Sequence, residues 1–267
     1  MNILDEIIAH KKREVEEKKS LVPVKMLEKS IYFEGKPLSM KKYLLREDKS
    51  GIIAEFKRKS PSEGIINNHV KVEKTTIGYM QAGASALSVL TDTNFFGGKN
   101  EDVLMARKYN FCPIIRKDFI LEEYQVLETK SLGADTVLLI ASALTPEEVK
   151  NLAAFTKSLG MEVLLEVHNE QELKAYLNDD VDMLGVNNRN LGTFETAIQT
   201  SIDLANLIPD EFVKVSESGI KTPETVLELR KYGYRGFLMG THFMKYSRPE
   251  KACADFIDGL KLITVEQ

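Results

Sequence analysis

The chain has 267 residues, of which 43% are hydrophobic and 28% are charged, a balance typical of a globular protein. Its net charge is −4, so no general basic field would attract nucleic acid. No apolar run approaches the roughly 20 residues that cross a bilayer, and the N-terminus lacks the basic and apolar regions of a signal peptide. We therefore expect a cytoplasmic protein with neither a nucleic acid nor a membrane as partner.

The cysteines and histidines argue against a metal site. Cys112 and Cys253 are far apart and have no metal-binding spacing, which suits a reducing cytoplasm. The four histidines are equally scattered, at positions 10, 69, 168 and 242. No metal is expected.

The chain begins with a helical pattern. Residues 2–19 place Ile3, Leu4 and Ile7 before a run of mixed charges, which predicts an amphipathic helix with a solvated surface end. Residues 24–45 predict further short helix, and residues 51–56 predict a buried strand.

From there strands and helices alternate. After residues 51–56, short strands are predicted at residues 86–90, 113–116, 136–140, 162–166, 183–186, 213–215 and 236–239. Between them lie helical patterns, for example at residues 70–81, 124–132, 146–159, 170–177, 197–207 and 223–232. Thr145-Pro146 and Thr222-Pro223 have the form of helix starts, and glycines follow several helices.

Eight alternating units without a linker predict one α/β domain, a (β/α)8 TIM barrel over residues 1–267 with residues 1–45 as an N-terminal helical extension. A doubly wound open sheet is the competing fold. That fold usually carries a G-x-G-x-x-G fingerprint after its first strand, and the chain has none.

Polar residues stand at nearly every predicted strand end, where barrel enzymes carry their active sites. Ile53, Glu55 and Lys57 share one face of the first strand because side chains alternate along a strand. Ile115, Lys117 and Phe119 share one face of the third. An ion pair at a strand end is the plain structural alternative for each such set.

The last two strand ends indicate phosphate. Gly219 and Gly240 allow backbone N–H groups to approach an anion closely, and phosphate sites after strands 7 and 8 recur in this fold. Glycine at a strand end is also ordinary turn chemistry, so it is the pair at these two strands that favours phosphate.

Two lysines and three glutamates converge on the predicted barrel mouth: Lys57, Lys117, Glu55, Glu166 and Glu217. A partly desolvated lysine loses pKa and serves as a general acid near neutral pH, and a carboxylate among carboxylates gains pKa. A self-satisfied ring of ion pairs would leave Asn187 and Arg189, which suit substrate oxygens, unexplained at the same rim.

The sequence closely resembles the indole-3-glycerol phosphate synthase family over nearly its whole length. The resemblance rests on residues 53–62, 88–92, 95–96, 115–119, 164–168, 185–191 and 216–220. Lys99 and Thr241 depart from the family's usual residues and bear on local loop contacts. The resemblance implies a barrel with extra N-terminal helices that cover the substrate.

The resemblance further implies a lyase of tryptophan biosynthesis. It would close the ring of 1-(2-carboxyphenylamino)-1-deoxyribulose 5-phosphate, with decarboxylation and dehydration, to give indole-3-glycerol phosphate. Lys117 is implied as general acid and Glu166 as general base, although Lys57 and Lys117 are able to exchange acid roles between the two steps. Acids, bases and proximity suffice for this reaction, so no cofactor is expected.

The resemblance also implies binding roles. Glu55 and Asn187 would position hydroxyl and amine groups, Lys57 and Arg189 would hold anionic groups, Phe119 would pack on the aromatic ring and Glu217 would bind polar groups. The phosphate side would be lined by Ser60, Ser218, Gly219, Gly240 and Thr241. A monomer is expected, with an oligomer left open, because the mixed surface offers no interface stripe.

Two other functions compete with this interpretation. A phosphoribosylanthranilate isomerase would need one acid and one base, which leaves the Glu55 and Lys57 pair beside Lys117 unexplained. A binding barrel without catalysis would be expected to lack Lys117 or Glu166. No fused isomerase is expected, because the sequence covers one barrel only.

Overall fold

Eight parallel strands form a closed barrel in the computed structural model, which describes residues 3–190 and 192–265. Their order around the barrel is β1-β10-β9-β8-β7-β6-β5-β4. The predicted (β/α)8 fold is therefore confirmed. The strands are β1 (Ile52–Phe56), β4 (Ala86–Leu90), β5 (Ile114–Lys117), β6 (Thr136–Ile140), β7 (Glu162–Val167), β8 (Met183–Asn187), β9 (Val213–Glu217) and β10 (Tyr234–Met239).

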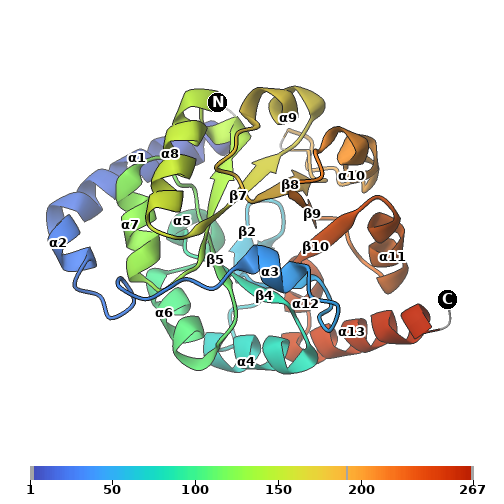
Figure 1. Ribbon diagram of the computed structural model, residues 1–267. Coiled ribbons are helices and arrows are strands. Elements are labelled where there is room, and N and C mark those ends of the chain that lie inside the picture. The colour runs from blue at the N-terminus through green and yellow to red at the C-terminus, as the bar shows by residue number, and fades with distance from the viewer. Residues whose placement is uncertain (1–2, 191, 266–267) are drawn as a thin grey trace.

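Helices surround the barrel (Figure 1). They are α4 (Val72–Ala82), α6 (Asn100–Tyr109), α7 (Glu123–Ser131), α8 (Pro146–Ser158), α9 (Glu170–Tyr176), α10 (Gln199–Leu204), α11 (Pro223–Lys231) and α13 (Pro249–Val265). The shorter α5 (Thr93–Phe96), α12 (Thr241–Met244) and two 3-10 turns, Ala141–Ala143 and Ala205–Leu207, follow strand or helix ends. The expected starts are confirmed: Thr145 forms a capping box with Glu148, and Thr222 caps α11.

Several elements were not named in the predicted pattern. The Ser-Pro-Ser-Glu-Gly turn lies in a small antiparallel hairpin, β2 (Lys59–Ser60) with β3 (Gly64–Ile65). The predicted pattern also omitted α6 and α13. The signal for α13 was readable, because Cys253, Phe256 and Ile257 are apolar at helical spacing and all three are buried.

The apolar core has two layers, as strand alternation requires. Inward-facing residues such as Ile53, Ile115 and Leu164 fill the barrel, and outward-facing residues such as Leu165 pack beneath the helices. The interior layer also includes Met40, from the N-terminal segment.

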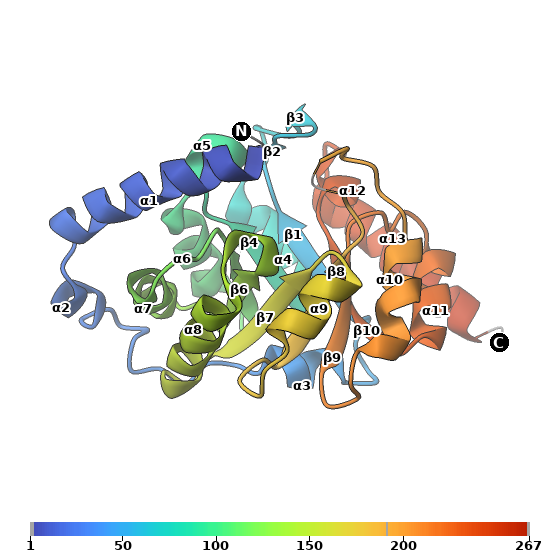
Figure 2. The ribbon, with the colours of Figure 1, turned by 90° about the horizontal axis from the view of Figure 1, so that it is seen from above.

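Of the N-terminal helices, the first and the third lie at opposite ends of the barrel (Figure 2). Helix α1 (Ile3–Leu21) lies over the end that carries the cavity described below, α2 (Val24–Leu27) lies near α7, and α3 (Met40–Leu44) lies at the opposite end (Figure 2). Helix α3 places Met40 and Leu44 in the barrel interior. Asn2 of the predicted first helix and Leu191 of the family motif lie outside the described residues.

The expectation that the charged part of α1 is a solvated face was wrong for Lys11. This side chain is 1% exposed, and its Nζ lies 2.9 Å from both Asp92 Oδ2 and Asp118 Oδ1. Burial alone would lower the pKa of Lys11, but Asp118 and Asp92 raise it above its usual value. Both carboxylates come from the strand-end loops of the barrel, so spacing within α1 did not reveal them.

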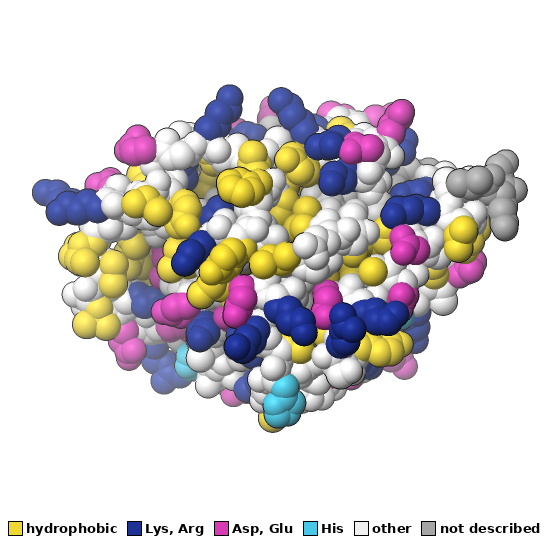
Figure 3. All heavy atoms as spheres, turned by 90° about the horizontal axis from the view of Figure 1, so that it is seen from below, with side chains coloured by type: hydrophobic (Ala, Val, Ile, Leu, Met, Phe, Trp, Pro, Cys, Tyr) yellow, Lys and Arg dark blue, Asp and Glu magenta, His cyan; other side chains and the backbone are white. Residues whose placement is uncertain are grey.

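On the face drawn in Figure 3, Lys and Arg side chains are interspersed with Asp and Glu. Among the described residues, no helix is long and apolar enough to cross a membrane.

Candidate active site

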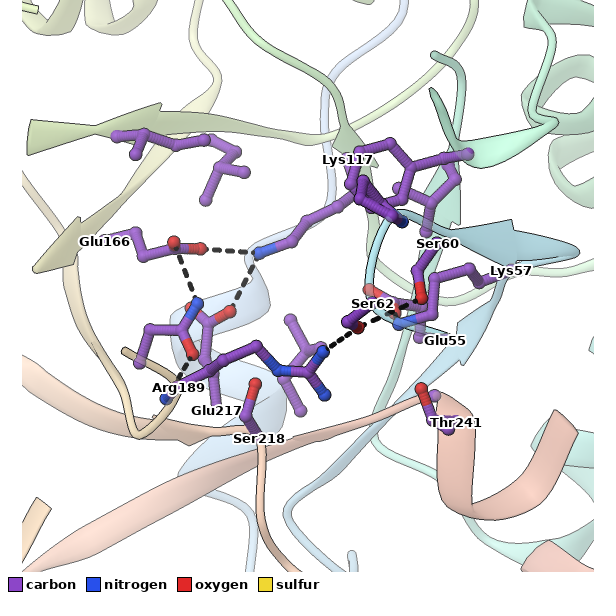
Figure 4. A pocket seen from close by; sticks show the side chains of 18 of the residues that line it. Glu55, Lys57, Ser60, Ser62, Lys117, Glu166, Arg189, Glu217, Ser218 and Thr241 are labelled. Atoms are coloured by element: carbon purple, nitrogen blue, oxygen red, sulfur yellow. Dashed lines mark hydrogen bonds and ion pairs between the residues drawn. The ribbon is translucent and has the colours of Figure 1, made fainter. Parts of the chain in front are cut away.

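A cavity of about 220 Å³ opens at the carboxyl ends of the barrel strands (Figure 4), where enzymes of this fold carry their active sites. The structure brings every candidate site residue named from the sequence to this one cavity, and their roles stay predictions. They are Glu55, Lys57, Ser60, Lys117, Phe119, Glu166, Asn187, Arg189, Glu217, Ser218, Gly219, Gly240 and Thr241.

Glu55 is held by two side chains. Its Oε1 lies 2.9 Å from Lys57 Nζ, and its Oε2 accepts a hydrogen bond of 3.0 Å from Ser88 Oγ, the residue opposite it in the β1–β4 register. Burial alone would raise the pKa of Glu55, but Lys57 and Lys117 lower it below its usual value. A Cβ at Gly240 would lie 2.4 Å from Glu55 Oε1, so this glycine makes room for the carboxylate.

Lys117 bridges two carboxylates across the barrel mouth. Its Nζ lies 2.8 Å from Glu166 Oε2 on β7 and 2.8 Å from Glu217 Oε2 on β9. Burial alone would lower the pKa of Lys117, but Glu166, Glu217 and Glu55 raise it. The argument that desolvation lowers the pKa of this lysine was therefore wrong, because three carboxylates outweigh burial.

Glu166 and Glu217 share Lys117 but differ in pKa. Burial, reinforced by the neighbouring Glu166, raises the pKa of Glu217 to about 7 against the effect of Lys117. Burial would also raise the pKa of Glu166, but Lys117 and His168 bring it well below its usual value. Of the two, only Glu217 follows the expectation that a carboxylate among carboxylates gains pKa. A Cβ at Gly185 would lie 2.3 Å from Glu217 Oε1, so glycine is needed beside it.

The end of β8 connects the carboxylates to the rim. Asn187 Nδ2 donates a hydrogen bond of 3.0 Å to Glu166 Oε1, and the Arg189 backbone N–H donates one of 3.0 Å to Asn187 Oδ1. The Arg189 guanidinium reaches across the mouth and donates to Ser62 Oγ, in the turn after β2 (Figure 4). Arg189 thereby joins loops from opposite sides of the cavity.

The turn after β9 has an unusual backbone. Ser218 has φ 67° and Gly219 has φ 77°, and a left-handed conformation costs a non-glycine residue roughly 1–2 kcal/mol. Asn188 Nδ2 holds the turn by donating a hydrogen bond of 3.0 Å to the Ser218 carbonyl. A Cβ at Gly219 would lie 2.7 Å from Thr196 Cγ2. Strained turns of this kind occur at ligand sites, including those for anions.

An apolar wall faces these polar groups. Phe119 and Phe96 lie with ring centroids 6.0 Å apart, and Ile3, Leu4 and Ile7 of α1 complete this side. The sequence argument did not place these α1 residues individually at the site. Their signal was the short apolar stripe at the start of the helix, which a surface helix would leave uncovered.

Other cavity residues were also missed. Ser62, Phe194 and His242 line the cavity but were not named as site residues. His168 contacts Glu166 from behind, with 3.4 Å between its Nε2 and Glu166 Oε1. Strand alternation was the available signal for His168, because residues 166 and 168 share a face of β7.

The arrangement suits acid–base chemistry on an anionic, partly aromatic ligand. A protonated lysine lies between two carboxylates of different pKa, which is the pattern that separates acid and base roles. Lys57 and Arg189 supply positive charge, the turn after β9 suits an anion, and the Phe96–Phe119 wall suits a flat ring.

Comparison with solved structures shows the same fold at low sequence identity. A tryptophan synthase alpha subunit from Legionella pneumophila aligns with a TM-score of 0.62 and 14% identity over 85% of this chain and 98% of its own. A 3-hexulose-6-phosphate synthase from Salmonella typhimurium aligns with a TM-score of 0.61 and 13% identity, covering 79% of this chain and 98% of its own.

Comparison of sequences is more specific. The family profile described as Indole-3-glycerol phosphate synthase matches residues 4–256. Relatives with that name include one from Bacteroides thetaiotaomicron, 48% identical over 97% of this chain and 99% of its own length. One from Thermoanaerobacter pseudethanolicus is 42% identical over 97% of this chain and 98% of its own length. The chain therefore belongs to the indole-3-glycerol phosphate synthase family.

Proposed function

We propose that this chain performs the indole-3-glycerol phosphate synthase reaction with Lys117 as general acid and Glu166 as general base. The activity is that of a decarboxylating lyase in tryptophan biosynthesis. The single observation that carries the assignment is the Lys117 ammonium, 2.8 Å from Glu166 and 2.8 Å from Glu217 inside the cavity. The proposed substrate is 1-(2-carboxyphenylamino)-1-deoxyribulose 5-phosphate.

The proposed chemistry has two steps. In the first, the ring carbon that carries the carboxylate attacks the ribulose ketone, and Lys117 gives a proton to the ketone oxygen as the carbon–carbon bond forms. The carboxylate then leaves as carbon dioxide, and its bonding electrons restore the benzene ring. In the second, the new hydroxyl leaves as water after protonation by Lys57, or by Lys117 once it has regained a proton from solvent, and Glu166 removes a proton from the neighbouring carbon to complete the indole.

Protonation states support these roles. A general acid must begin protonated, and the three carboxylates around Lys117 favour its ammonium form. A general base must begin ionised, and the lowered pKa of Glu166 favours its carboxylate. The substrate's own carboxylate and phosphate are expected to change this balance when they enter, because like and opposite charges both shift pKa over a few ångströms.

The remaining residues are proposed to hold the substrate. Phe119 would pack against the anthranilate ring, Glu55 and Asn187 would position the substrate's hydroxyl and amine groups, and Glu217 would bind polar substrate groups. Lys57 and Arg189 would hold anionic groups. The phosphate is proposed to lie against the turn at Ser218 and Gly219, with Ser60, Gly240 and Thr241 on the same side. Glycine and serine suit this because their backbone N–H and hydroxyl groups donate to phosphate oxygens.

We also propose a domain organisation, an oligomeric state and a cellular compartment. Residues 1–267 would form one domain, since Met40 and Leu44 of the N-terminal segment pack inside the barrel. A cytoplasmic monomer that needs no cofactor is proposed. Free thiols at Cys112 and Cys253 suit a reducing compartment, and the interspersed charges on the face in Figure 3 suit a solvated surface.

The test is direct because the chain contains no tryptophan, so indole product fluorescence is not masked. Purified protein without added metal or cofactor is mixed with the substrate, beside Lys117→Ala and Glu166→Gln. Each variant is expected to lose roughly 10²-fold or more in kcat. Lys150→Ala and Glu147→Gln, both exposed on α8, are the matched controls. Full activity in both site variants would refute the residue assignment, and no product from folded parent would refute the proposed reaction.

A further inference from the structure

His168 is a buried histidine that the mechanism above does not use. It follows β7 on the same face as Glu166, and its side chain is 10% exposed. Its Nε2 lies 3.4 Å from Glu166 Oε1, and its Nδ1 lies 3.2 Å from Glu172 Oε2 on α9. Glu172 Oε2 also accepts the His168 backbone N–H at 2.8 Å. The imidazole is therefore held between two carboxylates, one of them in the cavity.

The two carboxylates that share Lys117 have unequal surroundings. Lys117 lies 2.8 Å from each, so it does not distinguish Glu166 from Glu217. Glu166 accepts a hydrogen bond from Asn187 and has an ion-pair contact with His168 Nε2, an atom that itself has no hydrogen-bond partner among the described residues. Glu217 Oε1 is also buried without a hydrogen-bond partner there, and it has no such cation beside it other than Lys117. Asn187 is neutral. Of Asn187 and His168, only His168 is able to carry a positive charge, and that charge would lie beside Glu166 rather than Glu217.

We propose that His168, held by Glu172, is a positioning residue whose imidazolium keeps Glu166 ionised and aimed at Lys117, so that Glu166 rather than Glu217 is the base. The proposal rests on the base role proposed for Glu166. It links α9, outside the barrel, to the reacting groups. Glu172 orients the ring by accepting a hydrogen bond from Nδ1, the ring brings its charge to within 3.4 Å of Glu166, and Glu166 faces Lys117.

The local charges agree with an imidazolium. Burial alone would lower the pKa of His168, but Glu166 and Glu172 raise it to about 10. The titratable groups that face Glu166 from the other strands are Lys117 on β5 and Glu217 on β9. At neutral pH the cluster thus holds two cations against its carboxylates, with His168 and Lys117 on opposite oxygens of Glu166.

The first test is the pH dependence of kcat/KM, which reports the free enzyme. His168→Gln keeps a hydrogen-bonding side chain and removes the charge, so the pKa of Glu166 should rise. The acid limb that Glu166 sets, which is distinct from the ionisation of Glu217 near pH 7, should move to higher pH by roughly 1–3 units. The substrate's own ionisations are common to parent and variant and cancel in the difference. His168→Arg returns a cation and should restore the parental limb. His69→Gln, an exposed histidine, is the matched control.

An unshifted limb in His168→Gln would overturn the proposal, as would a limb that stays shifted in His168→Arg. A second measurement needs no variant of this residue and no turnover. In an NMR titration of the parent, the His168 ring should remain an imidazolium above pH 8, and in Glu172→Gln its pKa should fall by about one unit or more. A His168 ring that titrates near pH 6.5 overturns the proposal even if the chain forms product. Absence of product overturns the proposed reaction instead.

Discussion

Replacing Lys11 by methionine should destabilise the folded chain strongly. The substitution keeps most of the length of the side chain and removes an ammonium that lies 2.9 Å from Asp92, Asp118 and Glu14. At an effective dielectric constant of about 20, each contact has a Coulomb energy of about 6 kcal/mol, most of it offset by desolvation of the ammonium. Because Asp92 and Asp118 stay buried without this partner, the expected loss is roughly 3–5 kcal/mol in the free energy of unfolding.

The loss should depend on pH. Burial would raise the pKa of Asp118, but Lys11 and Arg116 lower it to about 2. This is below the unfolded value of about 3.9, so the contribution of Asp118 to stability is complete above pH 4 and is lost as the pH falls toward 2. Without Lys11 the pKa is lowered less. The difference between parent and variant should therefore be largest at pH 7 and should narrow between pH 4 and pH 2.

Urea unfolding followed by far-UV circular dichroism measures both the loss in the free energy of unfolding and its dependence on pH. A loss of 3–5 kcal/mol corresponds to about 5–9 °C in Tm for a chain of this length, from an unfolding entropy of about 0.56 kcal/mol/K. Lys12→Met is the matched control, because Lys12 is the exposed neighbour on the same helix, and it should change stability by less than about 0.5 kcal/mol. Equal losses in Lys11→Met and Lys12→Met would refute the argument from buried charge.

Two further outcomes are expected. Gly240→Ala should lower kcat/KM by about 10²-fold, as misplaced catalytic groups do, because the new Cβ would lie 2.4 Å from Glu55 Oε1; unchanged kinetics in a folded variant would mean that Glu55 is not required where it lies. Glu217→Gln should remove the ionisation near pH 7 from the profile of kcat/KM, because burial and Glu166 raise the pKa of Glu217 to about 7; a profile that retains it would assign that ionisation to another group.

Strand alternation carried most of what could be predicted about the site. It placed Glu55 and Lys57 on one face, and Lys117 and Phe119 on another, and all four line the cavity. The reason is physical: in a parallel barrel the carboxyl ends of all strands meet, so residues distant in sequence converge without any need to know their contacts.

The features that could not be predicted depend on contacts between residues that are far apart in the sequence. The pattern of α1 showed Lys11 among other charges, but its partners Asp92 and Asp118 belong to β-strand ends far along the chain. The pKa direction of Lys117 likewise depends on three carboxylates whose distances only the folded barrel sets. Gly185 makes room for Glu217 through a close approach that no local pattern records.

Helix α3 packs into the end of the barrel opposite the cavity, and its partners there are made much later during synthesis on the ribosome. The Lys41 backbone N–H donates a hydrogen bond of 2.9 Å to Glu162, and the Lys41 ammonium donates one of 2.8 Å to the Glu211 carbonyl, across separations of 121 and 170 residues. The segment that closes the bottom of the barrel thus emerges early, while its partners emerge late. Until β10, the strand that closes the barrel against β1, leaves the exit tunnel, Met40 and Leu44 have no complete barrel to enter, and they remain exposed apolar surface for chaperones to bind.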